Sequence, residues 1–449
     1  MKYHYELTDE EVGAADEAGL IMQPTTDHRW TINTTLLFFR TSTGIPLSVS
    51  NPSGSVRFRC TTLPATTSLD LPRTQDSVDG LEFVGFTRYT AQTIFDRYTA
   101  LPLPTQIANE LLGYISGQIY QIRSSPFVGL SPDEAMRRIS IRQDIREAIL
   151  DPQFLDLYGS QPLHFWVHDT VRINYLTLAH LLERLKVSSA AILAKKKANI
   201  VRVLTLLGSA APQPLAESTQ DASQNPNVTI SSASDHTLLR NCTIVDAPPA
   251  ILPDHTVLYK VKCGSELIVP DEGLIREDGL VNLARLNSYP AGDFNAEQVA
   301  LYLAAEEETA EIYRLFQVRR NPHAETWMII IQIPNAFFES LRHEQLWISH
   351  DWKKYVWYCR KGNTPPAKFA RVSPEADVIE GHICKAEQVR LTKMDAHEVQ
   401  ERLDDSMVLR TLDGLSSVQW AFMKLDTIRA LSEAVKGKIH VQIFRPYNN

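Results

Sequence analysis

The spacing of apolar residues divides the chain into a first part with mostly helical patterns and a second part in which strands and helices alternate. Thr8-Asp-Glu-Glu11 has the pattern of a capping box and predicts a short acidic helix. Helical periodicity then recurs over 91–98, 105–122, 131–150 and 170–185, and we expect helix again over 195–207. Strand patterns over 30–58 predict a small β element, and the Thr-, Pro- and Ser-rich stretch 61–80 predicts a loop.

Strand patterns return in the second part of the chain. They cover 256–262, 327–333, 377–381 and 438–443, and a helix is predicted over 296–316 with a strand-like start at 299–303. This alternation predicts a mixed α+β domain.

The stretch between the two parts changes composition sharply. Residues 208–236 are rich in Gly, Ser, Pro, Gln and Asn and hold few large apolar side chains, so we expect a flexible linker. The predicted organisation is a mostly helical N-terminal domain of unknown role (1–207), the linker (208–236) and a second α+β domain (237–449).

Composition then narrows the class of protein. The chain has 449 residues, of which 44% are hydrophobic and 22% charged, as in ordinary globular proteins. Its five cysteines include no Cys-x-x-Cys pair, so neither a zinc knuckle nor a disulfide framework is predicted. With no secretory signal or transmembrane pattern, we expect a cytoplasmic protein with reduced thiols and no membrane partner. A net charge of −8 argues against a protein whose main task is to grip phosphate backbones.

Four segments of the second part follow one another in an order that resembles the ADP-ribosyltransferase-like superfamily, closest to a little-characterised bacterial and fungal subfamily. The segments are Val257-Leu-Tyr-Lys260; Gly292-Asp-Phe294 with Tyr302 and Tyr313; the helix pattern 351–360 with the strand 377–381; and Gln419-Trp-Ala-Phe422 before a helix at 427–435. The resemblance covers about 190 residues and implies a mixed α/β transferase fold with NAD as substrate.

The resemblance also implies roles for particular side chains. Lys260, beside Tyr259, takes the position that hydrogen-bonds the adenosine ribose, and Tyr302 would stack on nicotinamide with Tyr313 behind it. Gln419 takes the position at which active members commonly carry the Glu that contacts the ribose 2′-hydroxyl. The site expected on this basis comprises Gln419, Tyr302 and Lys260 as catalytic residues, with Tyr259 and Tyr313 added for NAD binding.

Two of these positions depart from the active pattern. Lys260 replaces His or Arg and loses bidentate geometry, and Gln419 replaces Glu and removes an anion that would favour an oxocarbenium. The leading hypothesis is therefore an enzyme that transfers ADP-ribose from NAD, or hydrolyses NAD, with a protein or small-molecule acceptor. The first alternative is an inactive binding or scaffold protein that keeps the fold.

A third hypothesis is a tRNA-dependent transferase of the fungal arginine-containing cyclodipeptide synthase kind. The basic runs Lys195–Lys197 and Lys353–Lys361 would then contact tRNA. His164 and His168 stand four apart, but no third ligand is obvious, so no metal is expected. The chain has no Gly-x-Gly-x-x-Gly, Walker or Gly-x-Ser-x-Gly motif, which removes support for kinase, dehydrogenase and hydrolase functions.

Overall fold

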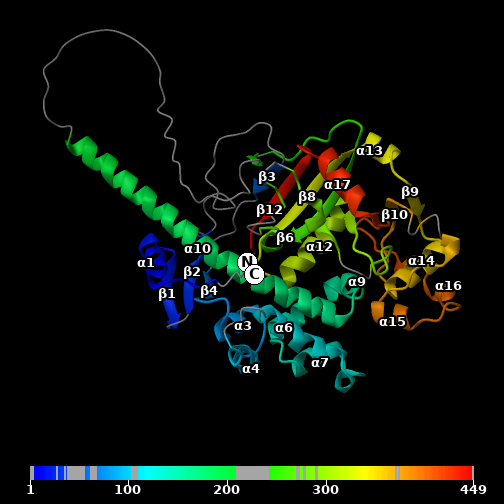
Figure 1. Cartoon of the computed structure of the whole chain (residues 1–449), viewed down its shortest axis with the longest axis horizontal. Coiled ribbons are helices and arrows are strands. Elements are labelled where there is room, and N and C mark those ends of the chain that lie inside the picture. Colours follow the sequence, from blue (N-terminus) through cyan, green and yellow to red (C-terminus); the bar gives the residue numbers. More distant parts are fainter. Residues whose placement is uncertain are drawn as a thin grey trace, which may run out of the picture.

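The computed structural model shows a mixed α/β protein with a helical N-terminal region and a mixed sheet (Figure 1). It describes residues 5–26, 29–34, 37, 56–60, 68–102, 110–208, 242–245, 247–268, 274–276, 280–288, 292–369, 372 and 375–446. The linker expected over 208–236 lies outside the described residues, apart from Gly208.

Within the described residues, the strands form a small antiparallel sheet and a large mixed one. The small sheet has the order β1 (Ile21–Thr26), β2 (Arg29–Asn33), β4 (Ser68–Pro72). The large sheet has nine strands in the order β5 (Cys242–Ile244), β3 (Val56–Cys60), β12 (Ile439–Phe444), β8 (Thr326–Pro334), β6 (His255–Cys263), β7 (Leu301–Ala304), β11 (Val418–Phe422), β10 (Val378–His382) and β9 (His343–Leu346). The pairs β5–β3, β3–β12 and β10–β9 are parallel and the others are antiparallel.

Most helices of the first part coincide with predicted stretches. The helices are α1 (Asp9–Ala18), α3 (Val78–Val84), α4 (Arg88–Thr99), α6 (Leu111–Tyr120), α7 (Pro132–Arg138), α8 (Gln143–Ile149), α9 (Leu155–Tyr158) and α10 (Leu163–Gly208). Helices α3 and α9 were not predicted, and residues 105–109 of the helix predicted over 105–122 lie outside the described residues. The capping box of Thr8 and Glu11 is confirmed. The pattern over 131–150 splits into α7 and α8, because Ser140 between them adopts a left-handed φ of 63° that no helix continues through.

Helix α10 joins two predicted stretches into one helix of 46 residues, about 70 Å long. The apolar periodicity predicted over 170–185 is confirmed as one buried stripe, since the helical core contains Tyr175, Leu178, Leu181, Leu182 and Leu185. The C-terminal part of the helix extends away from the rest of the protein (Figure 1). Residues 194–200 are all exposed, and Lys196 Nζ donates to the Glu17 carbonyl of α1 at 2.6 Å. The basic run Lys195–Lys197 thus lies on a solvated helix.

The helices of the second part cover the two faces of the large sheet. They are α11 (Gly264–Leu267), α12 (Glu307–Arg320), α13 (Asn335–Glu339), α14 (His350–Arg360), α15 (Gln388–Lys393), α16 (Val399–Arg402) and α17 (Leu425–Ala434). Helix α12 packs over β6, β8 and β7 on one face. On the other face, α17 and the short 3-10 helix Leu283–Leu286 bury Ile428, Leu431 and Leu286 in one core with strand residues.

Three sequence predictions change in position. The helix predicted over 296–316 is strand β7 followed by α12, because the strand-like start is a complete strand and the chain turns at 305–306. The loop predicted over 61–80 contains β4 and the start of α3. In the β element predicted over 30–58, β2 belongs to the small sheet, whereas β3 lies in the large sheet between β12 and β5.

The first and second parts of the chain are also joined through their cores. Phe316, Ile383 and Leu409 belong to the same buried cluster as the N-terminal helices. Together with β3 in the large sheet, these contacts show that residues before 208 complete the packing of the second part.

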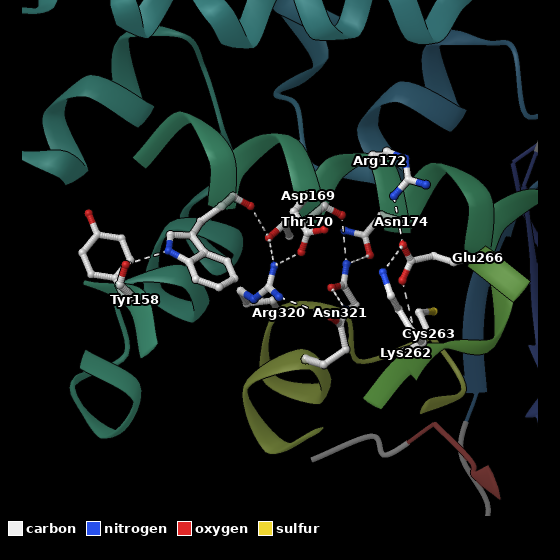
Figure 2. Close-up of polar contacts among 12 residues, drawn as sticks. Tyr158, Asp169, Thr170, Arg172, Asn174, Lys262, Cys263, Glu266, Arg320 and Asn321 are labelled. Atoms are coloured by element: carbon white, nitrogen blue, oxygen red, sulfur yellow. Dashed lines mark hydrogen bonds and ion pairs between the residues drawn. The ribbon is translucent and has the colours of Figure 1, made fainter. Parts of the chain in front are cut away.

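A line of polar contacts along α10 fixes this helix against the second part (Figure 2). Arg320 donates to Asp169 and to the Thr170 hydroxyl, each at 2.8 Å. The Asn321 side-chain amide, fully buried, donates to the Thr170 carbonyl at 2.9 Å and to Asn174 Oδ1 at 2.8 Å. Further along the helix, Arg172 pairs with Glu266 at 3.0 Å.

We predict that Asn321→Ala lowers the free energy of unfolding by about 2 kcal/mol, because it leaves the buried Asn174 Oδ1 without its donor and removes a second hydrogen bond to the Thr170 carbonyl. Urea denaturation followed by circular dichroism measures the change. Asn363→Ala, at an exposed position after α14, is the matched control and should change stability by less than about 0.5 kcal/mol. Equal stability of the two variants would show that the polar contacts along α10 do not hold this helix against the second part.

Candidate functional site

Tyr302 and Gln419 lie on the same face of the large sheet, on neighbouring strands. In the antiparallel pair of β7 and β11, Tyr302 stands opposite Ala421 and Gln419 opposite Ala304. Because side chains alternate with a period of two, both point to the face that α12 covers. This shared face brings together the second and fourth segments of the family resemblance.

The carboxylate of Asp293 is the centre of the polar network at this point. Gln419 Nε2 donates to Asp293 Oδ2 at 2.7 Å, the Cys384 backbone N–H donates to the same oxygen at 2.9 Å, and Arg360 Nε donates to Oδ1 at 2.7 Å. The Asp293 and Arg360 side chains are 3% and 4% exposed. Such a buried charge pair persists only when its remaining hydrogen-bonding capacity is used, as it is here.

Arg360, the last residue of α14, carries the network to the first part of the chain. Its Nη2 donates to the Cys384 carbonyl at 2.9 Å, and its Nη1 donates to the Ser160 carbonyl in the loop before α10. Gln388 Nε2 returns a hydrogen bond to the Arg360 carbonyl at 2.6 Å. One guanidinium therefore joins α14, the β10 end and the N-terminal helices.

The Asp293 contact fixes the orientation of the Gln419 amide. An ionised carboxylate only accepts hydrogen bonds, so the amide NH₂ must face Asp293 and the carbonyl oxygen must point elsewhere. Among the described residues, none donates to Gln419 Oε1. Gln419 therefore offers one acceptor of fixed position on the face that carries Tyr302.

The hydroxyl of Tyr302 is held by the loop that carries Asp293. It accepts from the Phe294 backbone N–H at 2.8 Å and donates to Asn295 Oδ1 at 3.1 Å. Gly292 is required at the start of this loop, because a Cβ there would lie 2.7 Å from Asn295 Oδ1 and 2.9 Å from the Tyr302 hydroxyl. Burial, and then the Asp293 charge, raise the pKa of Tyr302 well above its usual value, so the hydroxyl stays protonated.

Of the two further tyrosines of the resemblance, Tyr259 shares this face and Tyr313 packs against the N-terminal helical core. Tyr313 comes from α12, and burial together with the Asp293 charge raises its pKa to about 12. Tyr259 stands opposite Ala304 in the register of β6 and β7, so its side chain points to the α12 face. Both residues are half-buried.

Lys260 lies on the opposite face of the sheet. It alternates with Tyr259, stands opposite Ile329 of the core beneath α17, and its Nζ donates to Ser288 Oγ at 3.0 Å. Burial and the Lys262 charge lower its pKa to about 7, so the amine is partly neutral at physiological pH. The structure thus brings Gln419, Tyr302 and Tyr259 to one face and places Lys260 on the other, whereas Tyr313 packs against the N-terminal helical core.

The cysteines near the network are buried thiols. Burial and the Asp293 charge raise the pKa of Cys384 to about 12, and that of Cys359 rises equally, so both remain thiols. No group of three or more metal-ligating side chains occurs among the residues described. His168 contacts Ser116 Oγ at 3.0 Å and stacks on Tyr120, which is helix packing between α10 and α6.

Asp293 and Asn295 received no role from the sequence, and Arg360 received only that of a tRNA contact in the basic run Lys353–Lys361. The structure instead buries the Arg360 side chain against Asp293. Asp293 and Arg360 were visible as parts of the Gly292-Asp-Phe294 and helix-end motifs. Asp293 and Arg360 are 67 residues apart in the sequence, so their ion pair produces no local sequence pattern, and only the fold reveals that the two side chains meet.

Comparisons with protein families, with curated proteins and with solved structures returned no significant match. Within the part of the chain that the structure describes, no helix has the length and apolar character needed to cross a membrane.

We predict that Gln419→Glu destabilises the protein by about 1–3 kcal/mol at pH 7, because it sets a second carboxylate against Asp293. The folded-state pKa of the new carboxyl would rise above its unfolded value, so folding would bind a proton. The destabilisation should grow as pH rises through that interval and shrink towards about pH 4.

Urea denaturation at several pH values measures this effect. Gln92→Glu is the matched control, since Gln92 also donates its amide to an aspartate, Asp96, at 2.7 Å, but on the exposed face of α4. We expect a change below about 0.5 kcal/mol there. If the Gln419→Glu variant and the native chain had the same free energy of unfolding at every pH, the buried Asp293–Gln419 contact would be refuted.

Proposed function

We propose that the protein is a transferase-type enzyme that acts on NAD, by ADP-ribosyl transfer or NAD hydrolysis, with its site on the α12 face of the large sheet. The observation that carries the proposal is the fixed carbonyl oxygen of Gln419, held by Asp293 on the same face as Tyr302. A fixed acceptor beside an aromatic ring suits a ribose hydroxyl next to a nicotinamide ring.

Each residue takes a role that its contacts allow. Tyr302, with its hydroxyl tied to the Phe294 loop, presents a ring of restricted orientation for stacking on a cationic nicotinamide. Gln419 Oε1 accepts from the ribose hydroxyl. Asp293 and Arg360 are positioning residues, because their charged groups are spent on each other and on Gln419 and Cys384. Holding these groups in advance lowers the cost of orienting the substrate.

The site offers little net negative charge to stabilise an oxocarbenium ion. Gln419 is neutral, and the charge of Asp293 is balanced by Arg360 at 2.7 Å. Lys260 lies on the other face and, in this arrangement, does not join Tyr302. We therefore infer slow turnover, with ribose orientation rather than charge stabilisation as the main contribution.

A binding protein without NAD turnover is the second candidate. The specific observation in its favour is the complete use of the Asp293 carboxylate by three donors, which leaves no carboxylate oxygen unshared in the network. A network satisfied in this way also serves to fix a unique core.

We predict that NAD raises the melting temperature of the full-length protein in a dose-dependent way. At an NAD concentration one hundred times the dissociation constant, the free energy of unfolding should rise by about 2.7 kcal/mol. Tyr302→Ala should abolish the shift, Tyr302→Phe should retain it because the ring remains, and the exposed Tyr89→Ala should match the native chain. Thermal-shift titration with chromatographic detection of nicotinamide measures both steps.

The two candidates give different outcomes in this experiment. A shift with nicotinamide release supports the enzyme, and a shift without release supports the binding protein. No shift with NAD, or full activity in Tyr302→Ala, removes the proposed site.

A further inference from the structure

A cluster of basic side chains lies at the β3–β12 end of the large sheet. In this parallel pair, His440 stands beside Arg57 and Gln442 beside Arg59. The alternate residues Val56, Phe58 and Val441 enter the core beneath α17. Arg57, Arg59 and His440 therefore project to the opposite face, the one that carries α12.

The three basic groups lack partners within the described part of the chain. Arg57 is exposed and Arg59 is half-buried, and neither makes an ion pair or side-chain hydrogen bond with a described residue. The His440 ring is 2% exposed, and neither of its nitrogens has a hydrogen-bond partner. Buried polar atoms in native proteins are nearly always paired, so a buried imidazole without partners points to a missing one.

The imidazole is neutral at physiological pH. Burial, followed by the charges of Arg59 and Arg57, lowers the pKa of His440 to about 4. A neutral ring carries one N–H donor and one bare nitrogen. The cluster thus combines two fixed positive charges with a buried donor between neighbouring strands.

This cluster is separate from the Tyr302 site. Helix α12 packs over β8, β6 and β7, which lie between β12 and β11 in the sheet order. On the side facing the cluster, the Arg314 guanidinium of α12 stacks 4.0 Å above Phe444, and the same group binds Glu311. The Glu311 carboxylate is thereby neutralised within α12.

We propose that Arg57, Arg59 and His440 form a binding site for a phosphate group of a nucleotide or RNA. A planar guanidinium can donate two parallel hydrogen bonds to two oxygens of one phosphate. The ammonium of a lysine, which acts as a point charge, lacks this bidentate geometry. Side chains two positions apart on a strand are roughly 7 Å apart at the Cα atoms, close enough for two arginines to share one phosphate or a diphosphate. The His440 N–H supplies a further donor.

The test is calorimetric titration of the full-length protein with inorganic pyrophosphate at low salt. We expect saturable binding, weakened about tenfold by Arg57→Gln and again by Arg59→Gln. Arg57→Lys should also weaken binding, since it keeps the charge and loses the fork. Arg390→Gln, which removes a 76%-exposed arginine on α15, is the control and should bind as the native chain does.

Two further titrations identify the source of the phosphate. If ATP binds more tightly than a short single-stranded RNA, the ligand is a nucleotide. If the RNA binds more tightly, and its affinity depends less steeply on salt concentration in Arg57→Gln, the ligand is a nucleic acid. Arg57 is exposed, so its variants should fold even where a His440 variant does not. Absence of pyrophosphate binding, or equal affinity in Arg57→Gln and Arg390→Gln, would overturn the proposal.

Discussion

The buried carboxylate of Asp293 is the constraint on which this structure depends. A carboxylate at 3% exposure is tolerated only with a counter-charge and full hydrogen bonding, and it obtains both from Arg360, Cys384 and Gln419. These partners come from α14, the segment after β10, and β11. Satisfying one anion therefore fixes three elements of the second part relative to one another, and the Arg360 contact to Ser160 adds the N-terminal helices.

The same network explains why an amide is suited to position 419. Glu at position 419 would face Asp293 directly and require a proton, whereas Gln donates its NH₂ to Asp293 and keeps its carbonyl oxygen as an acceptor. The amide thus suits a site that already contains a buried carboxylate. In the function that we propose, such a site would orient a ligand better than it would stabilise positive charge.

Local patterns in the sequence predicted most of the elements. The capping box at Thr8, the stripe of α10 and the strand Trp327–Ile333 were all found, because each depends on neighbours within a few residues. The break at Ser140 was missed, since a single left-handed residue leaves the apolar period on either side intact. The role of β3 was missed because strand pairing over hundreds of residues has no local signal.

The candidate site was predictable only in part for the same reason. Alternation along β6 separates Lys260 from Tyr259, and the sequence contains that alternation, but which face meets α12 depends on the whole sheet. Motif order placed Tyr302 and Gln419 near each other, and the register of β7 and β11 accounts for it. The meeting of Asp293 with Arg360 required the fold.

The most direct measurement of the central claim is a double-mutant cycle of Asp293→Asn and Arg360→Met, followed by urea denaturation. If the buried pair organises the site, the two changes should be strongly non-additive, with a coupling energy of at least about 2 kcal/mol. The exposed pair Asp426 and Arg429 of α17 should give less than about 0.5 kcal/mol. Additive effects at Asp293 and Arg360, within about 0.5 kcal/mol, would contradict the account.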